Sequence, residues 1–363
     1  MKANNTCGIS ISYFFKKIKL LFRFSKNIFI LSIKSLSAYD IVIRFARYKA
    51  VADRKESGLL EIDYEAIAGY ERMTDCINAI LEKYPQTENG YIGTSILGRG
   101  LLYLRLGHGK SASLFVGAHH GMEHITSNLL IKFIEDALAC ERSGARIAGG
   151  FDVRYILAHR SVYVIPMLNP DGVEIETGGA ETAGLLRERL LAMNGGNHNF
   201  VSWQANARGV DLNHNYDAGF AECRKLEHEH GIYSGGPTRY GGEYPESEPE
   251  TAALCRLTRF LTPNLRCAVA LHTQGEEIYW DYLGKAPKGS RMLAECFANV
   301  SGYRVSAPDG IASYGGYKDW VISELGIPAF TIECGYGKNP LPPADFYKIY
   351  EKVLPILLTA AAF

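Results

Sequence analysis

Histidine and glutamate side chains follow short apolar runs at several points of this chain. The runs 113–118, 162–168, 268–271 and 329–332 end in His119-His120-Gly121-Met122-Glu123-His124, Asn169-Pro170-Asp171-Gly172, His272-Thr273-Gln274 and Glu333. Zinc binds imidazole nitrogen and carboxylate oxygen, and a catalytic zinc site keeps a fourth position open for water. A His-x-x-Glu pair with a distant His would supply three ligands. A further carboxylate could then act as general base on water.

The ligand register stays open on the residues alone. An isolated His-x-x-Glu pair is a weak signal, and His120 and His124 are four residues apart, which is also a spacing that can place two ligands together. The other histidines carry no such pattern, and we expect them to be solvated or structural: His108, His159, His228 and His230.

The elements that must position these residues alternate between strand and helix. Short apolar runs, among them 101–106 and the four named above, have the length and composition of buried strands. Apolar residues recur at helical spacing from Asp63 to about Pro85, over 125–137 and over 344–358. This alternation predicts an α/β fold with helices on both faces of a sheet. In such sheets, sites gather at the carboxyl ends of the strands.

Read together, the motifs resemble the zinc metallocarboxypeptidase family. The matching segments, in order, are His120-x-x-Glu123, Asn169–Gly172, Gly209-Val210-Asp211-Leu212-Asn213, Ser247-Glu248-Pro249-Glu250-Thr251, His272 and Glu333. The resemblance runs from about residue 60 to the C-terminus. It implies a single catalytic domain over residues 59–363, in which a mixed β-sheet is sandwiched between α-helices, and it makes His120 rather than His119 the ligand.

Longer phrases are similar to the γ-D-glutamyl-meso-diaminopimelate peptidase I branch of that family. They lie at Trp203–Asn213, Leu271–Trp280, Tyr314–Trp320 and Glu333–Pro342. The branch cuts bacterial cell-wall peptides, so the resemblance implies a zinc hydrolase acting on muropeptides. Three alternatives stay open: a metallocarboxypeptidase of other specificity, a zinc deacylase of N-acyl amino acids, and a non-catalytic binder of wall peptides.

The resemblance also implies residue roles. One Zn²⁺ ion would be held by His120, Glu123 and His272, and would activate a water molecule. Glu333 would take the proton of that water and pass it to the leaving amine. Arg208 would stabilise the oxyanion, although the family often places its arginine beside the Trp, where this chain has Gln204.

Substrate contacts are expected from Asn213, His214, Lys318, Asp319 and Tyr317. Digestive carboxypeptidases carry an Arg where this chain has His214, and a His lacks the bidentate fork of Arg. Substrates with carboxylates elsewhere therefore fit better than ordinary protein C-termini. Lys318 and Asp319 either face the zwitterionic end of diaminopimelate or pair with each other. Tyr314 is the alternative to Tyr317 as the mobile tyrosine of many relatives.

Composition separates a basic N-terminal part from an acidic remainder. The 363 residues hold 39 Lys or Arg and 39 Asp or Glu, but residues 1–55 alone carry a net charge of +10. We expect residues 1–58 to be a basic extension without catalytic chemistry. Contact of this extension with a membrane surface is the alternative that we do not favour. The acidic remainder argues against a nucleic-acid partner. Eight scattered cysteines without a Cys-x-x-Cys pair favour a reducing compartment. We expect a cytoplasmic protein, with export or a membrane surface as the alternative.

Overall fold

The computed structural model describes residues 62–65, 69–308 and 310–363, and of these the side chains of 311 and 312 are also left out. The predicted extension 1–58 lies outside the described residues. Within them, no helix combines the length and the apolar character that a bilayer span requires. The seven cysteines in this part of the chain are free.

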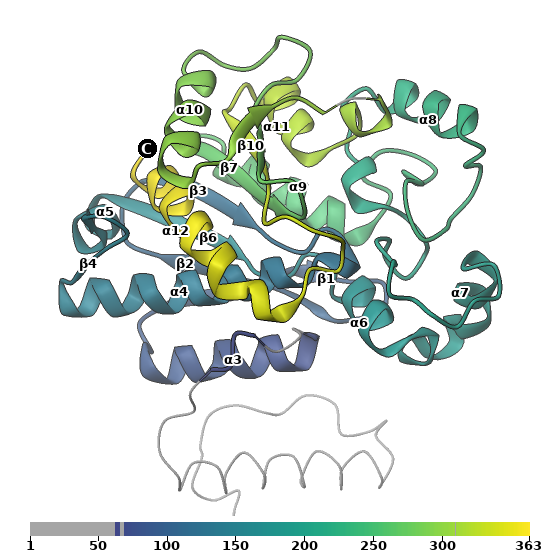
Figure 1. Cartoon of the computed structure of the whole chain (residues 1–363), viewed down its shortest axis with the longest axis horizontal. Coiled ribbons are helices and arrows are strands. Elements are labelled where there is room, and N and C mark those ends of the chain that lie inside the picture. The colour runs from purple at the N-terminus through teal and green to yellow at the C-terminus, as the bar shows by residue number, and fades with distance from the viewer. Residues whose placement is uncertain (1–61, 66–68, 309) are drawn as a thin grey trace, which may run out of the picture. The chain divides into compact units, whose positions relative to one another are not determined.

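An eight-stranded mixed sheet forms the centre of residues 62–363 (Figure 1). Its order is β1-β2-β6-β3-β7-β10-β8-β9, and β6, β3, β7 and β10 run parallel. The strands are β1 (Glu88–Thr94), β2 (Gly100–Leu106), β3 (Ser111–Val116), β6 (Arg160–Ile165), β7 (Leu265–His272), β8 (Glu277–Tyr279), β9 (Arg304–Ser306) and β10 (Ala329–Glu333). β4 (Arg146–Ile147) and β5 (Phe151–Asp152) form a separate pair. The predicted mixed sheet is confirmed.

Helices cover both faces of the sheet. One face packs against α3 (Tyr70–Lys83), α4 (Ile125–Ser143), α5 (Val153–His159), α10 (Ser290–Ser301) and α12 (Phe346–Ala362). The other packs against α9 (Pro249–Leu261) and α11 (Tyr317–Leu325). In β3, Phe115 contributes to the first core while Leu114 and Val116 contribute to the second. Because both faces are covered, the central strands read as continuous apolar runs.

The remaining helices lie in the connections. They are α6 (Pro170–Gly178), α7 (Arg187–Met193) and α8 (Phe220–Glu229), with short 3₁₀ turns η1 (Gly121–Glu123), η2 (Ala180–Leu186), η3 (Leu212–His214), η4 (Gly310–Ser313) and η5 (Pro343–Asp345). Figure 1 shows α6, α7 and α8 on the right of the view, on the opposite side from α5.

The first predicted helix begins later than its apolar spacing indicates. The side chain of Asp63 accepts a hydrogen bond from the Glu65 amide (3.1 Å), which closes a turn instead of a helix. α3 begins only at Tyr70, whose amide donates to the Glu174 carboxylate (2.7 Å). A side chain 104 residues away therefore helps to fix this helix start, and spacing within the segment could not show it.

The predicted helix start at residues 247–251 is confirmed, because α9 begins at Pro249. Proline is favoured there because an amide hydrogen in the first turn of a helix has no partner within the helix, so proline loses nothing by lacking one. The next residue, Glu250, is fully buried and accepts hydrogen bonds from the Ile96 amide (3.2 Å) and the Asn206 side chain (3.4 Å). Burial raises the pKa of Glu250 to about 8.

Replacing Glu250 by Gln should therefore alter how stability depends on pH. The Glu250 carboxyl in the unfolded chain loses its proton near pH 4.5, whereas the folded protein retains it to about pH 8. The wild type thus loses stability as pH rises through this window. We expect Glu250→Gln to gain stability relative to wild type between pH 5 and pH 9, on the order of 2 kcal/mol. Urea unfolding at both pH values, with exposed Glu229→Gln as control, measures this. If the free energies of unfolding of Glu250→Gln and wild type differ by the same amount at pH 5 and at pH 9, the prediction is wrong.

Candidate active site

The carboxyl ends of three adjacent parallel strands bring the predicted chemical residues together. His272 is the last residue of β7 and Glu333 the last of β10, and the two are directly paired in the register of these strands. His120 follows β3, the neighbour of β7 on the other side. The expectation that these strand ends converge is confirmed.

The turn that carries His120 and Glu123 is held against a second segment of backbone. The amides of Gly121 and Met122 donate to the carbonyl oxygens of Gln204 and Trp203, both at 3.0 Å. A Cβ atom at Gly121 would lie 2.3 Å from the carbonyl oxygen of Gly172. Only glycine permits this approach, and the close contact fixes the turn that carries His120 and Glu123.

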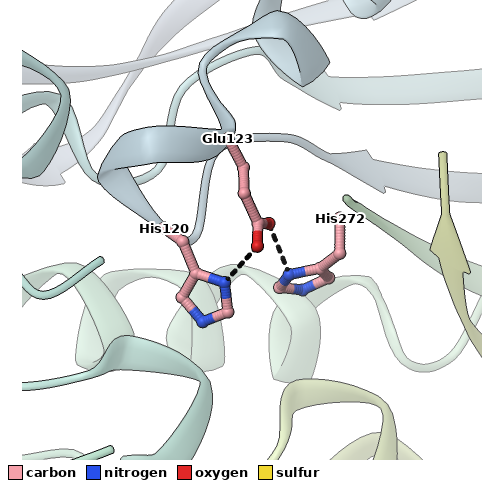
Figure 2. A group of neighbouring side chains, drawn as sticks. All are labelled: His120, Glu123 and His272. Atoms are coloured by element: carbon pink, nitrogen blue, oxygen red, sulfur yellow. Dashed lines mark hydrogen bonds and ion pairs between the residues drawn. The ribbon is translucent and has the colours of Figure 1, made fainter. Parts of the chain in front are cut away.

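The Glu123 carboxylate lies between two imidazoles (Figure 2). Its two oxygens face Nδ1 of His120 (2.9 Å) and Nδ1 of His272 (3.0 Å). One ligand atom from each of the three residues lies within 4.8 Å of the others. Two ring nitrogens that converge on an acceptor-only group form a ligand set that suits zinc, and they leave a coordination position free.

Asp211 holds the far side of the His120 ring. Its Oδ1 lies 3.1 Å from His120 Nε2 and accepts the amide hydrogen of Asn213 (3.2 Å), while Oδ2 accepts that of Arg239 (2.9 Å). A carboxylate on the second ring nitrogen fixes the orientation and tautomer of a metal-binding histidine. The Gly-Val-Asp segment thus supports the ligand set rather than belonging to it.

The neighbouring histidines point elsewhere. His119 is fully buried, with Nε2 3.1 Å from the Tyr216 hydroxyl. His124 is also buried, and its Nε2 lies 3.5 Å from the Glu176 carboxylate. His120 is accordingly the residue of this stretch that joins Glu123 and His272.

The two carboxyl groups of the centre differ in their proton affinity. Burial raises the pKa of Glu123, but the charges of His120 and His272 outweigh it and lower the pKa to about 2. Burial, and then the negative charge of Glu123, raises the pKa of Glu333 well above its ordinary value. Carboxyl groups whose pKa values are driven apart can take different chemical roles at one site.

Most residues predicted to contact substrate share one cavity with this centre. The cavity, of about 460 Å³, is lined by His120, Glu123, His272 and Glu333 together with Asn213, His214, Lys318 and Asp319. Lys318 and Asp319 are both buried and pair with each other, and Lys318 Nζ also donates to the carbonyl oxygen of Asp281 (2.6 Å). The internal ion pair exists, and it borders the space that a substrate would enter.

A buried polar chain supports His214 from behind. His214 Nδ1 lies 3.3 Å from Cys223 Sγ, and Cys223 in turn lies 3.6 Å from Glu227 Oε1. Cys223 and Glu227 stand four residues apart on α8, and Glu227 is neutralised by Arg224. By ligand type these three residues could also hold a metal ion. Helical spacing was the available sequence signal for this pair, but it did not show which side chain they support.

Two predicted site residues lie apart from the cavity lining. Arg208 is about half exposed and faces Glu248 (3.6 Å). Tyr317 is buried beside His119 and Tyr216, with its hydroxyl 2.8 Å from Thr258 Oγ1. Other residues that line the cavity were not predicted as site residues, among them Arg239, Gln204, Thr238 and Tyr279. Arg239 and Thr238 come from an irregular connection without a spacing pattern, which explains the omission.

Asp211→Asn should weaken metal binding without removing a ligand. The amide keeps an oxygen for the Arg239 amide hydrogen but lacks the charge that holds His120 Nε2. We expect the zinc dissociation constant to rise about 10- to 100-fold. Competition with a chromogenic chelator measures it, and exposed Asp217→Asn is the matched control. Equal zinc affinity in both variants would show that Asp211 does not support the ligand.

Comparison with known proteins agrees with this geometry. Residues 73–355 match the family model described as zinc carboxypeptidase. The chain is 34% identical to a γ-D-glutamyl-L-diamino acid endopeptidase of Lysinibacillus sphaericus, over 80% of this chain and 71% of that protein. It is 32% identical to the uncharacterized YqgT of Bacillus subtilis, over 83% and 79%. The structure of thrombin activatable fibrinolysis inhibitor shares the fold, with a TM-score of 0.64, 19% identity and coverage of 82% and 74%. The chain belongs to the zinc carboxypeptidase family, as its motifs predicted.

Proposed function

We propose that this protein hydrolyses the bond between γ-D-glutamate and meso-diaminopimelate in bacterial cell-wall peptides. The observation that carries the proposal is the cavity itself, which joins a zinc ligand set and a free carboxyl group to a buried Lys–Asp pair. The relative from L. sphaericus, named for cleavage at a γ-D-glutamyl-L-diamino acid bond, supports the same substrate class.

Glu333 is the group that moves the proton. When bound, zinc would supply an electrophile that polarises the scissile carbonyl and acidifies water. Glu333 lines the cavity. Within the part of the chain that the structure describes, no group donates a hydrogen bond to its carboxylate. It can therefore accept a proton from the attacking water and deliver it to the leaving amine. The neighbouring positive charge of a metal ion would favour its ionised form.

Asn213, His214, Lys318 and Asp319 form the wall that we assign to the leaving diamino acid. Asn213 accepts the Tyr317 amide hydrogen (3.0 Å), which ties η3 to the start of α11 where Lys318 and Asp319 lie. Lys318 offers a cation for the distal carboxylate of diaminopimelate, and Asp319 an anion for its ammonium group. Exchanging an internal ion pair for two substrate pairs conserves charge, so neither group is left buried and unpaired.

Glu333→Gln should abolish turnover while leaving metal binding intact. Gln cannot accept a proton, and Glu333 is not among the ligands, so we expect kcat to fall at least about 10³-fold with one zinc retained. Release of diaminopimelate from L-Ala-γ-D-Glu-meso-diaminopimelate, with and without chelator, measures this beside Glu229→Gln. A zinc-loaded wild type that leaves the tripeptide intact would overturn the proposed substrate. Cleavage of N-acyl amino acids instead would identify a deacylase.

The double variant Lys318→Met/Asp319→Asn tests the wall for the leaving group. Removing both charges together leaves no lone buried ion, so the variant should fold. We expect wild type to prefer diaminopimelate over L-Lys at the leaving position by about 10-fold or more in kcat/KM. The double variant should lose this preference. A preference that survives would show that the pair is purely structural.

A further inference from the structure

Arg239 is a cation of the active-site cavity to which no described residue supplies a counter-charge. Lys318, which also lines the cavity, is neutralised by Asp319. Across residues 62–65, 69–308 and 310–363, by contrast, no hydrogen bond or ion pair engages the Arg239 guanidinium. Its side chain is exposed to the solvent of the cavity. An arginine placed in this way can bind an anionic ligand without first breaking an internal pair.

The backbone of Arg239 is fixed to the support of the metal centre. Its amide donates to Asp211 Oδ2 (2.9 Å), and the other oxygen of that carboxylate holds His120 Nε2 (3.1 Å). Arg239 has a φ of 67°, a left-handed conformation that non-glycine residues rarely adopt. On its two sides, the Thr238 hydroxyl bonds the Gln204 side chain and the Tyr240 carbonyl accepts the Asp211 amide hydrogen (2.8 Å). The guanidinium therefore starts from a fixed point beside the ligand set.

This fixed point belongs to a different wall from the one assigned to the leaving group. Asn213, His214, Lys318 and Asp319 are connected through η3 and α11. Arg239 shares the Asp211 carboxylate with Asn213, but it stands on a separate segment, in which Thr238 contacts Gln204 and the Gln204 carbonyl accepts the Gly121 amide hydrogen. With the leaving diamino acid on the first wall, the acyl side of the scissile bond is the part of the substrate that remains for Arg239.

We propose that Arg239 binds the free α-carboxylate of the γ-linked glutamyl residue and thereby selects γ-linked over α-linked substrates. This inference rests on the proposed function. A glutamyl residue linked through its side chain keeps its α-carboxylate, whereas in an α-linked peptide that group is the scissile carbonyl itself. A planar guanidinium can hold a carboxylate through two parallel hydrogen bonds, which an uncharged amide cannot reproduce.

The test pairs one protein change with one substrate change. L-Ala-γ-D-Glu-meso-diaminopimelate is compared with its analogue in which the glutamyl α-carboxylate is an amide, in wild type, Arg239→Gln and Arg239→Lys. We expect wild type to favour the carboxylate about 10- to 100-fold in kcat/KM. Arg239→Gln should lose that factor on the carboxylate substrate and stay within about twofold of wild type on the amide. Arg239→Lys should keep part of the preference.

Controls separate this role from others. Exposed Arg189→Gln should match wild type on both substrates, and zinc content and Tm should be equal in all variants. An equal loss on both substrates in Arg239→Gln would overturn the inference in favour of a general catalytic or structural role. An unchanged preference would assign the carboxylate to another residue. If zinc-loaded wild type cleaves neither substrate, the proposed function fails and this inference fails with it.

Discussion

The active site depends on one buried interaction, the Glu123 carboxylate between the imidazoles of His120 and His272. A buried carboxylate is strongly unfavourable unless charged or polar partners surround it. His120 follows β3 and His272 ends the adjacent parallel strand β7, 149 residues from Glu123 in sequence. The register of the sheet must therefore be correct before this carboxylate can be accommodated, and the same register places Glu333 opposite His272.

Asp211 extends this constraint to the walls of the cavity. One carboxylate orients the His120 ring, holds the start of η3 and fixes the backbone of Arg239. His214, the last residue of η3, is then supported from α8 by Cys223 and Glu227. The metal site and the cavity wall that we propose for the substrate consequently share Asp211 as a common support.

Much of the fold and of the metal centre could be predicted from sequence because the signals are local. Buried strands followed directly by His or Glu indicate which residues lie at the carboxyl edge of a parallel sheet. The residues alone left the register open among His119, His120 and His124, and the family resemblance favoured His120, which in the structure lies beside Glu123 and His272. Features that depend on distant partners could not be predicted in this way. They include the start of α3 at Tyr70, set by Glu174, and the burial of the Tyr317 ring beside His119. Arg239 belongs to the same class, since its amide hydrogen bond to Asp211, 28 residues away in sequence, helps to place it beside the cavity.

X-ray absorption at the zinc edge of the purified protein, loaded with one equivalent of zinc, tests the central claim most directly. Coordination by His120, Glu123 and His272 predicts only nitrogen and oxygen neighbours, at about 2.0–2.1 Å. A sulfur neighbour at about 2.3 Å would contradict it. Such a neighbour would place the metal at His214, Cys223 and Glu227 instead.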